Sequence, residues 1–171
     1  MNRQQVFRAG FALSGVALLQ ACGFKLRGTQ TFAFDTIAVE ASPAGAVTTE
    51  LRKALANHLL VNTATSQAGT PPVAQVTMDI LQELRERAVA GVNAAGQVRE
   101  LQLRIRVKFR LRNARGKDLI EETEILQQRD ISFSESAVLA KEVEEALLYK
   151  NMQADIVQQL LRRLAAVKSI V

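Results

Sequence analysis

One stretch near the middle of the chain alternates strictly between apolar and polar residues. From Leu101 to Arg112 every odd position is apolar and every even position is polar, and all the even positions after Gln102 are basic. Because successive side chains of a β-strand point to opposite sides, this spacing predicts a strand with one buried face and one polar face. A chain that contains such a strand needs a sheet and a second layer to cover the apolar side of that sheet.

The segments on either side of this strand predict two more long strands. Residues 73–90 alternate less regularly, since the pattern blurs after Leu81, and residues 119–133 form the third strand. The turns between the strands are short, at Asn93–Gly96 and Asn113–Asp118. Connections of this length join antiparallel strands, so the three strands are predicted to form an antiparallel meander.

Two other segments have the period of an α-helix. From about residue 48 to 60, apolar residues recur at intervals of four, and Thr48 is the expected N-cap. From about residue 136 to 167, an apolar stripe continues without any Pro or Gly. A short strand, a turn and a loop complete the pattern, at residues 36–40, 41–45 and 62–72.

The order β-α-β-β-β-α predicts the α+β class. We expect two layers: a mostly antiparallel four-stranded sheet with both helices packed on one face. The short first strand is expected to join the sheet through a right-handed crossover connection.

The N-terminus has the pattern of a secretory signal peptide. Arg3 and Arg8 precede an uncharged apolar run, which Leu19-Gln20-Ala21-Cys22 closes. A Cys directly after a small residue, with Leu three positions before it, is typical of bacterial lipoproteins. In these proteins the thiol receives a diacylglyceryl group and, after cleavage, the new amine receives an acyl chain. An ordinary signal peptide with an incidental Cys22 remains the alternative.

Lipidation of Cys22 would divide the chain into three parts. We expect a signal peptide at residues 1–21, a lipidated leader at residues 22–35 and a single α+β domain at residues 36–168. Gly23 follows the Cys where an Asp would retain the protein at the inner membrane, so we expect sorting to the outer membrane.

Composition argues against several classes of function. Cys22 is the only cysteine and His58 the only histidine, so we expect no disulfide, no metal site and a structural role for His58. No nucleophile elbow or phosphate-binding glycine loop occurs. Without Arg3 and Arg8 the chain keeps 20 basic and 17 acidic residues, and it has no Trp. This balance does not indicate a nucleic-acid partner, and we expect neither a cofactor nor an enzymatic activity.

Five segments resemble the lipopolysaccharide-assembly lipoproteins of the LptE family. Cys22–Gly28 resembles the start of the mature family proteins, Asn93–Glu100 their hairpin and Arg129–Phe133 the end of a strand. Leu139–Glu142 and Gln159–Leu164 resemble their last helix. The five segments occur in the family's order along the whole mature chain.

The resemblance implies a binding protein of the outer membrane that faces the periplasm. Family members plug and stabilise the β-barrel LptD and help to deliver and insert lipopolysaccharide (LPS) into the outer leaflet. The implied partners are LptD, LPS and, through the acyl anchor, outer-membrane lipid. In some members a basic hairpin residue and a Lys of the last helix contact LPS. The second maps onto Lys141; the first falls near Ala94, so Arg99 is the candidate replacement.

The polar face of the alternating strand supplies further LPS-binding candidates. Arg and Lys bind phosphate groups, which LPS carries. Two alternatives remain: a solvated face whose charges pair with the next strand, at Glu121, Glu122, Glu124 and Asp130, or a contact with acidic groups of the barrel wall. We call this face the basic row; its members are Arg104, Arg106, Lys108, Arg110 and Arg112.

Two other functions also remain open at this point. The chain could serve as an accessory lipoprotein of another outer-membrane assembly or secretion machine. It could also be a tethered periplasmic hydrolase of envelope polymers, although it lacks a recognisable nucleophile, metal cluster or acid pair.

Overall fold

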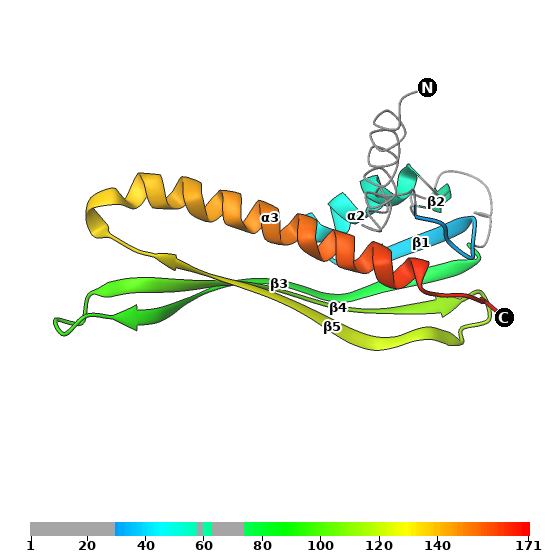
Figure 1. Ribbon diagram of the computed structural model, residues 1–171. Coiled ribbons are helices and arrows are strands. Elements are labelled where there is room, and N and C mark those ends of the chain that lie inside the picture. The colour runs from blue at the N-terminus through cyan, green and yellow to red at the C-terminus, as the bar shows by residue number, and fades with distance from the viewer. Residues whose placement is uncertain (1–29, 58–59, 63–73) are drawn as a thin grey trace, which may run out of the picture.

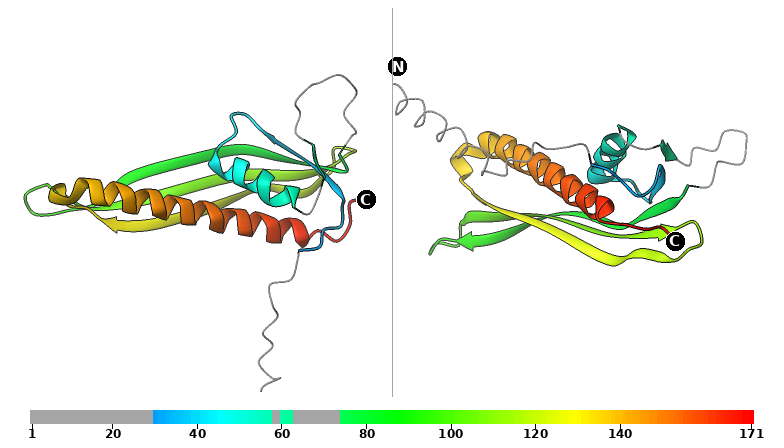
Figure 2. Two further views of the ribbon diagram at one scale, coloured as in Figure 1. Left: turned by 90° about the horizontal axis from the view of Figure 1, so that it is seen from above. Right: turned by 45° about the vertical axis from the view of Figure 1, so that its right-hand side comes forward.

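The computed structural model describes residues 30–57, 60–62 and 74–171. These residues form two layers, a twisted sheet and two helices that lie along one of its faces (Figure 1). Seen from above, the two helices lie side by side over the sheet (Figure 2). Cys22, His58 and nearly all of the loop predicted at residues 62–72 lie outside the described residues.

The strands form one sheet in the order β2-β1-β3-β4-β5. The α+β class and the two layers are therefore confirmed, but the sheet is mixed, because β1 pairs in parallel with both β2 and β3. The short strand β2 was not predicted, since three residues are too few to show alternation. The strand bounds are β1 Thr36–Ala41, β2 Leu60–Asn62, β3 Val76–Val92, β4 Val98–Asn113 and β5 Asp118–Ser132.

The helices are α2 (Ala46–Ala56) and α3 (Val138–Ala165), and a 3-10 turn, η2 (Glu135–Ala137), leads into α3. The bounds of α3 lie within two residues of the predicted ones. Helix α2 ends before residue 60, the predicted end, and Asn57 is its C-cap. Both helices bury an apolar stripe, so each contributes to the core between the layers.

Strand β4 has the two faces that its alternation predicts. Its apolar residues from Leu103 to Leu111 are at most 2% exposed and form the centre of the core. The polar residues between them are only partly buried and lie on the face of the sheet away from the helices. The central strand thus fixes which side of the sheet the helices cover.

The two turns of the meander are stabilised by the same pattern of Asn side-chain hydrogen bonds. In each, an Asn side chain (Asn93 or Asn113) accepts hydrogen bonds from the backbone N–H groups two and four positions later. Gly96 and Gly116 then take positive φ angles of 78° and 84°, which glycine adopts without strain. These short turns bring the long strands into antiparallel register.

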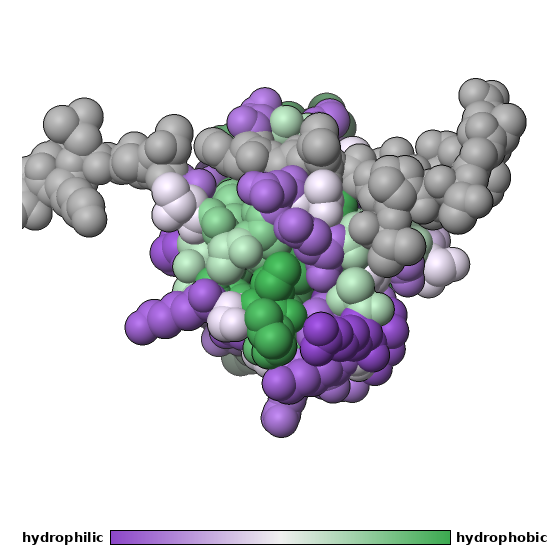
Figure 3. Space-filling model, turned by 90° about the vertical axis from the view of Figure 1, so that its right-hand side faces the viewer, coloured by the Kyte–Doolittle hydropathy of each residue, from purple (hydrophilic) through white to green (hydrophobic). Residues whose placement is uncertain are grey.

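The C-terminus is tied to the β4–β5 end of the sheet. The buried Asn113 donates a side-chain hydrogen bond of 3.1 Å to the carbonyl of Ile170. Ile170 packs against the core, whereas Val171 is 78% exposed. From this end, apolar side chains gather in the centre with hydrophilic ones around them (Figure 3).

Strand β3 contains a bulge at Leu81, where its register with β4 shifts between Ile80 and Gln82. The extra residue changes which side chains face the helices. Before the bulge the apolar residues face them; after it Glu83, Arg85 and other polar residues do, as their pairing with buried residues of β4 shows. This bulge explains why the alternation blurs after Leu81.

The bulge places Glu83 under the start of α2. Its carboxylate accepts hydrogen bonds from the backbone N–H groups of Val47 (2.8 Å) and Thr48 (3.1 Å) and from the Thr48 hydroxyl (2.9 Å). The prediction that Thr48 is the N-cap is therefore wrong. Gly45 is the N-cap residue, and Thr48 lies buried inside the first turn. The Glu83 carboxylate, which belongs to β3, thus accepts the backbone hydrogen bonds that an N-cap side chain usually accepts.

Candidate functional site

The structure divides the predicted binding residues between two surfaces. The basic row lies on the open face of the sheet, away from the helices. Lys141 lies on the first turns of α3, at the end of the molecule that also holds the β3–β4 turn (Figure 1). We call this the distal end; Arg99, which follows that turn, also belongs to it.

Most cations of the basic row have partners on neighbouring strands. Asp79 of β3 binds both Arg110 (2.6 Å) and Arg112 (2.7 Å). Burial alone would raise the pKa of the Asp79 carboxyl, but the hydrogen bonds and charges of the two arginines outweigh burial and lower this pKa below its ordinary value. Asp79 was not predicted as a partner, because the sequence pattern placed candidate carboxylates only on the following strand, whereas Asp79 lies opposite Arg110 on the preceding one.

The remaining members of the row are less tightly held. Arg106 pairs with Glu124 at 3.3 Å, as one of the two alternatives predicted. Arg104 donates to the side chain of Gln102 at 2.6 Å. Within the described part of the chain, Lys108 has neither an ion pair nor a hydrogen-bonding side chain. Neighbouring carboxylates thus neutralise three of the five cations, whereas Arg104 and Lys108 have no carboxylate partner among the described residues.

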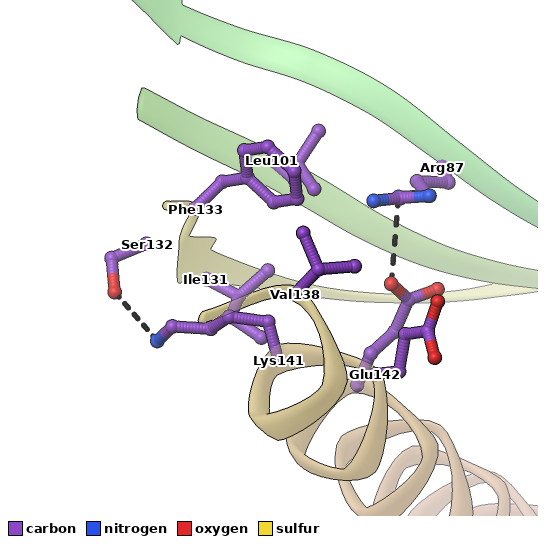
Figure 4. A pocket seen from close by; sticks show the side chains of 9 residues that line it. Arg87, Leu101, Ile131, Ser132, Phe133, Val138, Lys141 and Glu142 are labelled. Atoms are coloured by element: carbon purple, nitrogen blue, oxygen red, sulfur yellow. Dashed lines mark hydrogen bonds and ion pairs between the residues drawn. The ribbon is translucent and has the colours of Figure 1, made fainter. Parts of the chain in front are cut away.

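The distal end contains a pocket of about 220 Å³ between the sheet and the start of α3 (Figure 4). Lys141 forms one side of it, and its Nζ donates to Ser132 Oγ (2.9 Å) and to Glu144 Oε2 (2.8 Å). Lys141 is therefore positioned by two neighbours. The residues that line this distal pocket are Arg87, Leu101, Ile131, Ser132, Phe133, Val138, Lys141, Glu142 and Glu145.

Arg87 contributes a second cation to the distal pocket and was not predicted from the sequence. Its Nε lies 3.4 Å from Glu145, and its guanidinium lies 5.9 Å from the ring centre of Phe133. Its neighbour on the same face, Arg85, lies 3.5 Å over the ring of Tyr149. The broken alternation after Leu81 was the available signal, because a bulge there turns both arginines toward α3.

The distal pocket combines charge with an apolar floor. Leu101 and Ile131 are 6% and 4% exposed, whereas Lys141 and Arg87 reach the surface beside carboxylates. A phosphate group could replace Glu144 or Glu145 as the partner of these cations. The volume of the distal pocket lies below the roughly 300–1,000 Å³ of sites that enclose a small molecule. The pocket therefore suits one part of a larger amphiphilic molecule.

Arg99 lies beside a separate, shallow hollow of about 200 Å³ at the same end, with Ser134 and Ser136 on its other side. Its side chain donates to Gln97 at 3.3 Å, and its carbonyl accepts a hydrogen bond of 2.8 Å from the N–H of Phe133. The structure thus brings Arg99 and Lys141 to one end of the molecule, but into different depressions.

Other kinds of site find no support in the described residues. No group of His, Cys, Asp or Glu side chains among them could hold a metal ion. None of the helices described is long and apolar enough to cross a membrane.

Comparisons with known proteins agree with this picture. The model of the family described as "LptE: Lipopolysaccharide-assembly" matches residues 34–164. The solution structure of uncharacterized lipoprotein B from Nitrosomonas europaea is 31% identical with a TM-score of 0.69, and the match covers 84% of this chain and 91% of that one. A comparison with curated protein sequences gives no match.

Two crystal structures share the fold at lower identity. Rare lipoprotein B from Shewanella oneidensis is 21% identical with a TM-score of 0.61, covering 77% of this chain and 95% of that one. A minor lipoprotein from Acinetobacter baumannii is 18% identical with a TM-score of 0.59, covering 80% and 94%.

Proposed function

The chain belongs to the LptE family of lipopolysaccharide-assembly lipoproteins, and we propose that it plugs and stabilises the outer-membrane β-barrel LptD while LPS is inserted into the outer leaflet. In this proposal the protein binds and positions but catalyses no reaction. Its domain would be held at the periplasmic side of the outer membrane by acyl chains on Cys22. One acyl chain binds a bilayer only marginally, whereas two or three hold a protein stably.

The distal pocket is the proposed contact for LPS. The observation that carries this assignment is the arrangement of Lys141 and Arg87 on either side of an apolar floor. LPS joins phosphorylated sugars to acyl chains, so its charged corner would meet the two cations. The bound phosphate would take over the hydrogen bond that Lys141 now donates to Glu144.

The basic row is a second proposed contact for an anionic group. Because Asp79 and Glu124 already bind three of its arginines, Arg104 and Lys108 are the members of the row that pair with no carboxylate among the described residues. The row and the distal pocket lie on opposite faces of the sheet, so substitutions can test them separately.

Purification of the full lipidated chain from outer membranes in mild detergent tests the proposed function. We expect one large β-barrel to co-purify in equal amount, together with LPS. Recovery of a barrel from another assembly machine would favour the accessory-subunit alternative, and recovery of no barrel would contradict both. A Cys22→Ala variant should lose membrane association when the barrel is absent.

A further inference from the structure

The end of the molecule opposite the distal end joins three segments that are far apart in the sequence. The backbone N–H of Asp35 donates to Gln75 Oε1 at 2.7 Å, and the Gln75 carbonyl accepts a hydrogen bond of 3.1 Å from the N–H of Ala114. Ile170 is hydrogen-bonded to the end of β4 beside this turn, so the three segments form one surface. We call this surface the proximal end; it comprises residues 30–36, 114–120 and 162–171 (Figure 1).

The proximal end has an apolar centre that is not fully covered. Val171 is 78% exposed, and five further apolar side chains of this end are only partly buried against the core. These five are Phe32, Leu119, Ile120, Val167 and Ile170. Figure 3 shows the apolar centre with hydrophilic side chains around it, an arrangement that is typical of a contact surface.

The charged residues of the proximal end are mostly basic. Two acidic residues, Asp35 and Asp118, lie among five basic ones. Lys25 and Arg27 extend this excess in sequence, since no acidic residue occurs between Cys22 and the described part of the chain. An anionic surface is therefore the partner whose charge fits. The five basic residues are Arg115, Lys117, Arg162, Arg163 and Lys168.

The position of Cys22 in the sequence ties the acyl anchor to this end. Gln30 is the eighth residue after Cys22, and eight extended residues span at most about 29 Å. The distal end lies farther away, because the 16-residue strand β4 that separates the two ends is about 50 Å long. An anchored Cys22 thus holds the proximal end near the bilayer.

We propose that the proximal end rests on an anionic phospholipid bilayer in the lipoprotein that has not yet entered its barrel, and that the distal end then points away from the bilayer. Acyl chains and a basic patch together hold a protein more firmly than either does alone. The inference rests on the acylation of Cys22, which the proposed function includes. It adds to the acyl chains a membrane contact made by the folded domain itself.

The start of α3 is the competing apolar surface. Leu139 and Val143 are 79% and 72% exposed there. The exposed carboxylates of Glu142 and Glu144 lie beside them in the same turns, and an anionic bilayer repels such groups. The proximal end is therefore the surface on which exposed apolar side chains occur together with positive charge.

Fluorescence quenching on vesicles tests this orientation. Ala114 and Ala94 form a matched pair, because each is exposed and follows the Asn of one meander turn, at opposite ends of the sheet. Ala114→Cys and Ala94→Cys are made in the full lipidated chain, and each new thiol is labelled with a fluorophore. The proteins are bound to vesicles of phosphatidylethanolamine and phosphatidylglycerol in which some headgroups carry a nitroxide. We expect fluorescence to be lost at position 114 and retained at position 94, because a nitroxide quenches only at short range.

The wild type is the control for the anchor. Cys22 is its only cysteine, and an acylated thiol takes up no fluorophore. Labelling of the wild type would contradict the anchor of the proposed function and this inference with it. If the wild type stays unlabelled, quenching at neither position, or at position 94 as strongly as at 114, overturns the inference while the proposed function stands.

A charge substitution supplies the second measurement. Lys117→Gln with Lys168→Gln removes two exposed charges from the proximal end and should lower quenching at position 114 by about half or more. Lys53→Gln with Lys150→Gln removes the same charge from exposed sites on α2 and α3 and should leave quenching unchanged. All four side chains are exposed, so both variants should melt as the wild type does. Equal quenching in the two folded variants would contradict the proposed contact.

Discussion

At the scale of single residues, the start of α2 depends on Glu83. No side chain of the helix itself satisfies its first backbone N–H groups. The Glu83 carboxylate accepts two of them and adds a negative charge where the helix dipole favours one. Gly45 leaves the space that this carboxylate occupies, since a Cβ at position 45 would overlap it.

We therefore expect Gly45→Ala and Glu83→Ala each to lower the free energy of unfolding by about 1–3 kcal/mol. The first forces the carboxylate away, and the second leaves its donors without an acceptor. Because both changes remove one interaction, the double variant should lose less than the sum of the two. Urea unfolding of the four proteins measures this coupling, and strict additivity would contradict the capping role.

The pairing of Asp79 predicts an acid-dependent stability. Its lowered pKa means that the folded protein favours the ionised carboxylate more than the unfolded chain does. This contribution is complete above the unfolded value near 3.9 and is lost as the pH falls through the lower folded pKa. The melting temperature of the wild type should fall more steeply between about pH 5 and pH 2 than that of Asp79→Asn. Parallel curves would show that the arginines do not stabilise the ionised form.

At the scale of elements, the two faces of β4 should respond differently to truncation. Ile105→Ala or Phe109→Ala leaves a cavity in the core and should cost about 2–5 kcal/mol. Lys108→Ala on the open face should cost less than about 0.5 kcal/mol. Thermal unfolding of the three variants checks this ranking, and the reverse order would mean that the helices cover the other face.

The long periodic elements could be predicted from the sequence because each repeats its pattern over many residues. Strand β4 and helix α3 are the clearest cases, and the Asn and Gly residues marked both turns of the meander. Strand β2 has three residues, so it carries no periodic signal. The cap of α2 could not be predicted, because Glu83 lies 35 residues beyond Thr48 in the chain.

The candidate site was only partly predictable for the same reason. Lys141 and Arg99 were identified through the family resemblance, and the structure places both at the distal end. Arg87 was missed because strict alternation would turn it away from the helices, and the bulge at Leu81 reverses its direction. Long-range pairs such as Asp79 with Arg112 depend on strand register, which the spacing of residues does not specify.

At the scale of the whole molecule, the sheet separates two charged surfaces. The distal pocket faces α3, and the basic row faces away from both helices. Arg110 and Arg112 share the buried Asp79, which identifies this part of the row as a structural network. The cations of the distal pocket pair instead with Glu145 and Glu144 of α3, whose side chains are 17% and 50% exposed, so we expect a phosphate to be able to displace them.

The most direct test of this account is LPS binding by the full lipidated chain in detergent at two salt concentrations. Arg87→Gln with Lys141→Gln should weaken binding about tenfold or more at low salt, because two charge-assisted contacts are lost. Lys53→Gln with Lys150→Gln removes the same charge from exposed sites on α2 and α3 and is the matched control. The account predicts a large loss only in the pocket variant, diminishing at high salt. Equal affinity in the two folded variants would contradict it.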